Sequence, residues 1–182
     1  MNTISNVLKI SATTAILCLS ASQASAETSY YFGGNFAALE ADYDFIDDDA
    51  SLPVIYGRFG AQFNEHVSVE GRLGFGVGDD DVRYLGVDIN TEIDSLLGIY
   101  ARAGAPVSDK VYPYVIAGYT RGEATASVEG FSTSGSSNDI SFGVGVDIGI
   151  DDVFSANIEY MNWFDSDGSQ LGGISFGFLR KF

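Results

Sequence analysis

The chain has 182 residues, 25 acidic against 9 basic side chains, and a formal net charge of −16. Because phosphate recognition depends on lysine and arginine, this balance excludes nucleic acid as an expected partner. The sequence is also rich in glycine, phenylalanine and tyrosine, yet it has no apolar run of about 18 residues, which excludes a membrane-spanning helix.

Residues 1–26 have the pattern of a secretory signal peptide. Lys9 supplies the positive charge, residues 10–19 form a short apolar stretch, and Ala24-Ser25-Ala26 is a small-residue cleavage site. An amphipathic first helix of a cytosolic protein is the alternative, and it fits this order of features less well. We therefore expect an exported protein.

The mature chain, residues 27–182, is expected to form one domain. Cys18 is the only cysteine and lies within the predicted signal peptide. The mature chain would then contain no disulfide, no thiolate metal site and no cysteine nucleophile.

Eight segments of the mature chain alternate between apolar residues and small or polar ones. This alternation has the period of a β-strand, and glycine at so many positions would weaken a helix. The predicted strands are 30–41, 54–63, 67–78, 92–104, 111–121, 140–150, 153–164 and 173–182. Long polar loops (42–53, 79–91, 122–139 and 165–172) alternate with short turns (64–66, 105–110 and 151–152). An up-and-down antiparallel barrel has this spacing, with both termini on the side of the short turns.

The predicted strands differ in how clearly they assign their two faces. In 92–104 the apolar face is Ile93, Leu97, Ile99, Ala101 and Ala103. In 111–121 the assignment is ambiguous, because Tyr112, Tyr114 and Ile116 compete with Val115, Ala117 and Tyr119.

The apolar face of these segments suits lipid better than a barrel interior. Eight strands enclose a space just wide enough for side chains. The face of glycine, serine and charged residues fits into this narrow space better than the face of Phe, Ile and Val does. Aromatic residues also gather near the predicted strand ends, as in interfacial girdles. A soluble, lipocalin-like carrier with its apolar face inward is the alternative. We predict an all-β fold, an eight-stranded antiparallel up-and-down transmembrane β-barrel.

Four stretches carry a likeness to a known family. They are Tyr31-Phe32-Gly33-Gly34, residues 113–119, Ile158-Glu159-Tyr160 and residues 177–182. In these the chain resembles the small outer-membrane β-barrel family, the OmpA/OmpX-type eight-stranded proteins of Gram-negative bacteria. The resemblance implies a porin-like barrel in the cell outer membrane with both termini periplasmic. It also implies outer-membrane lipid and lipopolysaccharide as partners.

The same resemblance implies that the last strand is read by the barrel-assembly machinery during insertion. Phe176, Phe178 and Phe182 would form this assembly signal. Arg180 stands where the family commonly has an aromatic residue, and we expect it to reach toward lipid headgroups at the periplasmic rim.

The inward-facing phase contains three cations and three carboxylates at similar depth. Because unpaired charges in a barrel interior are costly, these residues predict an ion-paired network that plugs the lumen. Such a network is either the packing of a polar interior or a gate between closed and weakly conducting states. The six residues are Arg58, Glu70, Arg72, Arg102, Asp147 and Glu159.

Acidic residues cluster in the first two predicted loops. Divalent-cation binding beside lipopolysaccharide is one interpretation, and a solvated, repulsive loop surface is the one we favour. Asp165-Ser166-Asp167-Gly168 is similar to the start of a calcium loop but lacks its later ligands, so no metal site is predicted. The clustered residues are Asp42, Asp44, Asp47, Asp48, Asp49, Asp79, Asp80 and Asp81.

No catalytic constellation emerges from the sequence. Acyl transfer of the serine–histidine type needs a histidine next to the nucleophile, and His66, the only one, lies in a predicted turn. We therefore expect no enzyme and no cofactor. The sequence predicts a non-enzymatic barrel, monomeric or weakly associating, that contributes to envelope structure or to surface interaction through its loops. The alternative is a narrow water or ion pore with a charged gate.

Overall fold

The computed structural model describes residues 28–43, 50–84, 87–128, 131–166 and 169–182. The predicted signal peptide and the acidic positions 44–49 lie outside these ranges. No helix in the described ranges is long and apolar enough to cross a membrane. The described residues form nine strands: β1 (Ser29–Tyr43), β2 (Ala50–Gln62), β3 (Val67–Gly76), β4 (Asp79–Tyr84), β5 (Val87–Gly104), β6 (Val111–Val128), β7 (Phe131–Gly149), β8 (Phe154–Ser166) and β9 (Ser169–Lys181).

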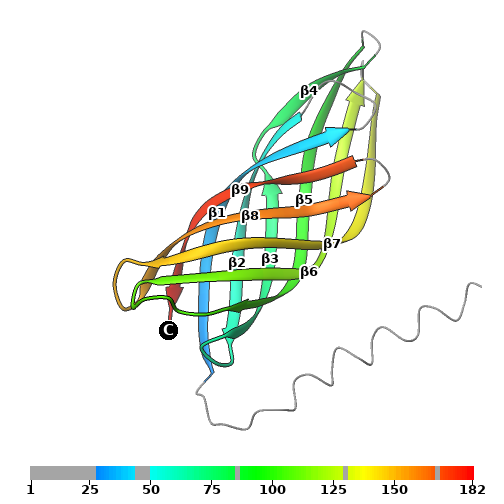
Figure 1. Cartoon of the computed structure of the whole chain (residues 1–182). Coiled ribbons are helices and arrows are strands. Elements are labelled where there is room, and N and C mark those ends of the chain that lie inside the picture. Colours follow the sequence, from blue (N-terminus) through cyan, green and yellow to red (C-terminus); the bar gives the residue numbers. More distant parts are fainter. Residues whose placement is uncertain (1–27, 44–49, 85–86, 129–130, 167–168) are drawn as a thin grey trace, which may run out of the picture.

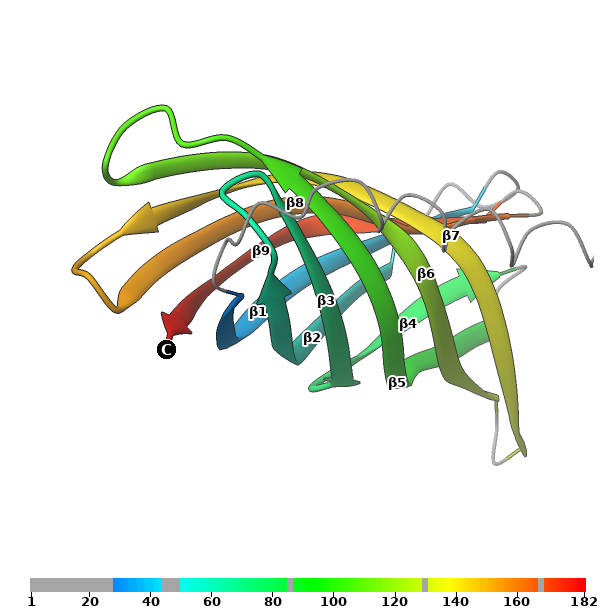
Figure 2. The same ribbon diagram turned by 90° about the horizontal axis from the view of Figure 1, so that it is seen from below.

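The strands form one antiparallel sheet that closes into a barrel. Their order is β3-β2-β1-β9-β8-β7-β6-β5-β4, and pairing of β3 with β5 completes the ring. Eight strands make the wall, while β4 pairs with the first residues of β5. Figures 1 and 2 show the strands tilting around a shared interior. The predicted eight-stranded antiparallel fold is confirmed.

Alternation along the strands separates an apolar outer wall from a polar interior. In β3 the exposed residues Val67, Leu73 and Phe75 alternate with the buried residues Ser68, Glu70 and Arg72. In β6, Tyr114 points inward and Val115 outward, which resolves the ambiguous segment. The predicted outer face of Phe, Ile and Val is therefore the exposed wall of the barrel.

One predicted outward residue, Ile93, is buried instead. The pairing of β5 with β6 shifts register between Ile93 and Ser95, which leaves Asp94 as a bulge. Because one extra residue reverses the alternation, Ile93 turns inward while Leu97 stays outward. Simple parity from one end of the strand therefore fails beyond the bulge.

The four predicted long loops are strand at all of their described residues, and the two longest are strand over most of their length. Residues 79–91 form β4 and the start of β5, and residues 122–139 continue β6 and β7 as a paired ladder from Gly122↔Ser137 to Val128↔Phe131. In Figure 1 the upper ends of β5, β6 and β7 reach beyond those of β8 and β9. At about 3.3 Å per residue, the 19 residues of β7 extend roughly 60 Å, far more than one bilayer crossing needs.

The opposite end of the barrel carries the short turns and the C-terminus (Figure 1). Asp151 accepts hydrogen bonds from the backbone N–H groups of Val153 and Phe154 at 2.8 and 2.7 Å. The two bonds lower the pKa of the Asp151 carboxyl below its ordinary value, and the bond from Phe154 has the larger effect. A polar side chain thus fixes the β7–β8 turn. Asn64 does the same for the β2–β3 turn.

Inward-facing glycines make room for tyrosine rings. A Cβ at Gly60 would overlap the ring of Tyr31, one at Gly98 that of Tyr100, and one at Gly145 that of Tyr114. Three tyrosine rings can therefore lie across the narrow interior: those of Tyr31, Tyr100 and Tyr114.

Candidate functional site

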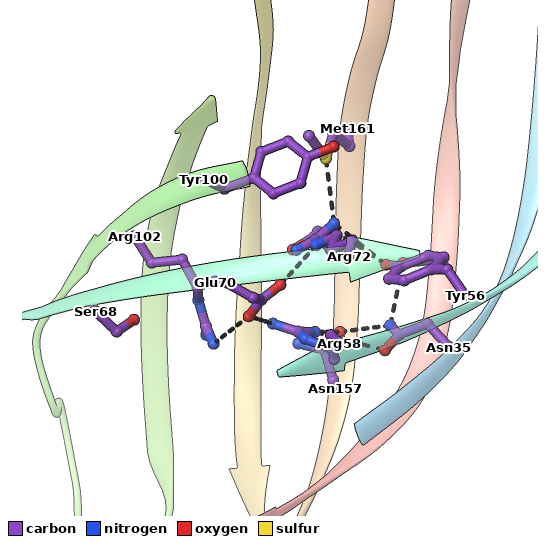
Figure 3. Close-up of polar contacts among 12 residues, drawn as sticks. Asn35, Tyr56, Arg58, Ser68, Glu70, Arg72, Tyr100, Arg102, Asn157 and Met161 are labelled. Carbon is purple, nitrogen blue, oxygen red and sulfur yellow. Dashed lines mark hydrogen bonds and ion pairs between the residues drawn. The ribbon is translucent and has the colours of Figure 1, made fainter. Parts of the chain in front are cut away.

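The structure brings all six predicted lumen charges into one buried cluster, which we call the charge network. β2 carries Arg58, β3 carries Glu70 and Arg72, and β5 carries Arg102. β7 and β8 supply Asp147 and Glu159 from the facing wall. Figure 3 shows the arginines converging on Glu70 in the middle of the barrel.

Glu70 is the centre of the network. One carboxylate oxygen accepts hydrogen bonds from Arg58 Nη2 at 2.6 Å and Arg102 Nη1 at 3.3 Å. The same oxygen accepts the Tyr31 hydroxyl at 2.8 Å, and the other oxygen accepts Arg72 Nε at 2.6 Å. A fully buried carboxylate is stable there because three cations surround it.

Glu159 anchors the other side of Arg72. The Arg72 Nη1 and Nη2 atoms donate to the two carboxylate oxygens at 2.5 and 2.7 Å, a bidentate pair. The hydroxyls of Tyr114 and Tyr56 also donate to Glu159, at 2.7 and 3.3 Å. Arg72 thus joins two carboxylates and ties the β3 wall to β8.

Asp147 and Asn157 complete the network on the side of the short turns. Arg102 Nη2 donates to Asp147 at 2.6 Å, and Asn157 Nδ2 donates to the other oxygen of Asp147 at 2.6 Å. Asn157 Oδ1 in turn accepts Arg58 Nη1 at 2.9 Å and Asn35 Nδ2 at 2.7 Å. Of the network atoms, the Nε of Arg58 and of Arg102 are buried without a hydrogen-bond partner.

Aromatic rings cover the guanidinium of Arg72. Its Cζ lies 5.0 Å from the Tyr56 ring centroid, 4.8 Å from that of Tyr100 and 5.6 Å from that of Trp163. Trp163, at a bulge in β8, is 2% exposed, and its carbonyl accepts the hydroxyl of Ser141 at 2.8 Å. The network therefore continues into an apolar and aromatic layer toward the long hairpins.

Sequence reasoning missed the neutral members of the network. Most of them share the inward parity of the charged residues, so alternation could have identified them as interior positions. Tyr114 is the exception, because it lies in the segment whose two faces the sequence leaves ambiguous. These residues are Tyr31, Asn35, Tyr56, Tyr114, Asn157 and Ser175.

The arrangement supplies positive and negative charge in equal number, and each of the six charged side chains has at least one opposite-charge partner within the lumen. Such a cluster holds the facing walls together and fills the space between them. Within the described ranges, no group of three His, Cys, Asp or Glu side chains is placed to hold a metal ion. The exposed His66 has its Nδ1 3.0 Å from the Gly104 carbonyl in the turn region.

Comparison with protein families identifies the chain over nearly its whole length. A model described as "Outer membrane protein beta-barrel domain" matches residues 10–182. The chain belongs to the outer-membrane β-barrel family. The resemblance to small eight-stranded outer-membrane barrels is confirmed, and so is the outer membrane as its location.

Solved outer-membrane barrels share the fold at low sequence identity. Ail of Yersinia pestis, in complex with the heparin analogue sucrose octasulfate, is 18% identical with a TM-score of 0.63, and the match covers 86% of this chain and 100% of that one. Neisserial surface protein A is 16% identical with a TM-score of 0.64 and the same coverage. OprG of Pseudomonas aeruginosa is 14% identical with a TM-score of 0.52, over 85% and 95%. Comparison with curated protein sequences gave no match.

In this outer-membrane barrel, the predicted assembly residues Phe176 and Phe178 lie on β9, the strand that closes the wall, and Phe182 follows it directly. Phe176, Phe178 and Phe182 are all exposed on the apolar face, and β9 pairs with β1 from Tyr31↔Lys181 to Tyr43↔Ser169. Arg180 is exposed, with its Cζ 5.8 Å from the Phe154 ring centroid. An aromatic partner on the neighbouring strand thus accompanies the cation at this position.

Proposed function

We propose that this outer-membrane barrel is a non-enzymatic surface protein whose interior is closed to solutes and whose wall supports tall hairpins outside the cell. The observation that carries the proposal is the charge network, in which the side chains of Arg58, Glu70 and Arg72 are at most 1% exposed. Matched ion pairs and tyrosine rings fill the lumen at mid-height, so the barrel acts as an anchor.

The orientation follows from the two unequal ends. In outer-membrane barrels, periplasmic turns are short and extracellular loops are long. By that rule the β6–β7 hairpin faces outward and both termini face the periplasm. The exposed ring of Phe131 at the end of this hairpin then offers an apolar contact to surface partners.

Lipid and lipopolysaccharide are the partners that the outer wall supports, because exposed Phe, Ile and Val side chains surround it. The barrel-assembly machinery is the proposed partner of β9 during insertion, and the inserted barrel is proposed to be a monomer. The sulfated ligand crystallised with Ail is a poor candidate here, since a chain of net charge −16 repels polyanions.

A narrow pore is the other function that the sequence allows, and the interior does not favour it. A cavity of about 20 Å³ beside Arg102 and Asp147 has room for about one water molecule, and the pocket of about 310 Å³ that Asp147 also lines lies among the short turns. Passage of ions would require several buried ion pairs to separate together.

Conductance in planar lipid bilayers tests the closed interior. The folded native protein is expected to give no large, steady current. Glu70→Gln, which removes the central carboxylate, is expected to raise the frequency of brief openings. A large, steady current from the native protein would establish a pore and end the proposal.

Orientation is tested by cysteine labelling in whole cells, because Cys18, the only cysteine, lies within the predicted signal peptide. Ser134→Cys, on the long hairpin, should react with a membrane-impermeant maleimide in intact cells. Asp109→Cys, in a short turn, should react only after the outer membrane is permeabilised. The reverse pattern would overturn the orientation.

A further inference from the structure

A second cavity lies at the hairpin end of the barrel, on the far side of the aromatic layer from the charge network. It measures about 350 Å³, and we call it the mouth cavity. Strands β1, β2, β5, β6, β7, β8 and β9 all contribute to its lining, so it belongs to the barrel mouth as a whole. Its apolar lining consists of Ala41, Leu52, Ile93, Leu96, Ala124, Phe164 and Leu171.

The mouth cavity is closed toward the membrane interior. Its apolar residues belong to the same packed cluster as Leu39, Tyr100 and Trp163, which are almost wholly buried. A molecule that enters from the hairpin end therefore meets this layer before it reaches any member of the charge network. The cavity has the geometry of a binding site rather than of a passage.

The polar part of the lining favours an uncharged ligand. Thr91, Ser136 and Ser137 supply hydroxyl groups, and Glu123 supplies a carboxylate that pairs with Arg121 at 3.1 Å. Neither lysine nor arginine is among the lining residues. An anion would therefore find no cation in the lining to bind it, in a chain whose net charge is strongly negative.

The volume sets the size of the ligand. A cavity of about 150 Å³ lined by Leu, Ile and Phe holds benzene, and ligand pockets begin at about 300 Å³. The mouth cavity is in this second range, which corresponds to roughly ten to fifteen non-hydrogen atoms.

We propose that the mouth cavity binds a small neutral amphiphile, with an aliphatic or aromatic body against the apolar lining and a hydroxyl-like end near Thr91 and Ser137. Burial of apolar surface supplies the affinity, and the hydroxyls set the orientation. Such binding adds a ligand to the proposed surface role but does not depend on it, since the cavity is present whether or not the core conducts.

The test uses 8-bromooctan-1-ol as the probe and Trp163 as the reporter. The chain has one tryptophan, it packs in the layer beneath the cavity, and bromine quenches its fluorescence. With the native protein folded in phosphatidylcholine vesicles, we expect quenching that saturates. The anion 8-bromooctanoate, of equal chain length, should bind about tenfold more weakly or worse.

Two variants fill the cavity from its β6–β7 wall. Ala124 and Gly135 are cross-strand partners that both line it, and a Cβ at Gly135 meets nothing within 4 Å. Ala124→Phe and Gly135→Phe should each weaken binding of the alcohol about tenfold or more. Ala126→Phe, on the same face but outside the lining, should bind as the native protein does.

Three other results would overturn the proposal. Quenching that rises without saturation, and equally in every variant, would show partitioning into lipid only. Saturable quenching that both filling variants retain would place the site elsewhere. Equal affinity for bromooctanoate would refute selection for a neutral ligand. Circular dichroism confirms folding, and because the two filling variants are independent, either one that folds decides the outcome.

Discussion

Replacement of Glu70 by glutamine removes the central carboxylate and leaves the shape of the side chain almost unchanged. Three arginines contact Glu70, but Arg72 keeps Glu159 and Arg102 keeps Asp147. Among the described ion pairs, Arg58 alone loses its carboxylate partner. The cost is therefore that of one broken buried pair, about 3–5 kcal/mol of unfolding free energy.

Urea unfolding of the protein in lipid vesicles, followed by Trp163 fluorescence, measures this loss. Glu92→Gln, at an exposed position of β5, is the matched control and should change stability by less than about 0.5 kcal/mol. In the double variant Arg58→Gln/Glu70→Gln the loss should be smaller than the sum of the single losses by about 1 kcal/mol or more. A Glu70→Gln loss equal to that of the control, or strict additivity, would refute the central role of this carboxylate.

Three further variants test other parts of the structure by the same unfolding assay. Arg72→Lys should cost about 1.5–3 kcal/mol, since lysine cannot make the bidentate pair with Glu159; an unchanged midpoint would contradict this. Val144→Arg, on the outer wall, should lower the unfolding free energy by about 2–4 kcal/mol. Its control, Ser134→Arg on the long hairpin, should lower it by less than about 0.5 kcal/mol. Equal losses would argue against a lipid-facing wall. Asp151→Ala should lower the midpoint at pH 7. The folded-state pKa of Asp151 is depressed, so its contribution is fully present above the ordinary value of 3.8 and is lost as the pH falls through the folded-state pKa. A difference that does not shrink as the pH falls below 3.8 would contradict this role.

Alternation along single strands was sufficient to predict the barrel and most of its two faces. It failed at Ile93, because the bulge at Asp94 depends on pairing with β6 and leaves no mark in one strand's own pattern. It also failed for residues 122–139, whose Gly, Ser and Thr composition is typical of loops. Many of these residues have a low intrinsic preference for strands. They form strands here because β6 and β7 pair with each other along this stretch.

The charge network shows a different limit. Parity and depth were enough to select its six charged residues. Which cation meets which carboxylate depends on positions across the lumen, such as Arg72 on β3 opposite Glu159 on β8. These strands are not neighbours in the sheet, so neither strand pairing nor sequence spacing specifies the contact.

Because β1 pairs with β9, the first strand of the barrel gains its second neighbour only when the last strand is in place. Leu39 and Gly173, which lie opposite each other in this seam, are far apart along the polypeptide, so joining them carries the largest loop-closure entropy in the wall. A nascent chain that lacks β9 would present a bare strand edge to hydrocarbon, where its backbone groups find no water. Stable residence in the bilayer therefore requires the last strand, because without it the edges of β1 and β8 have no partner.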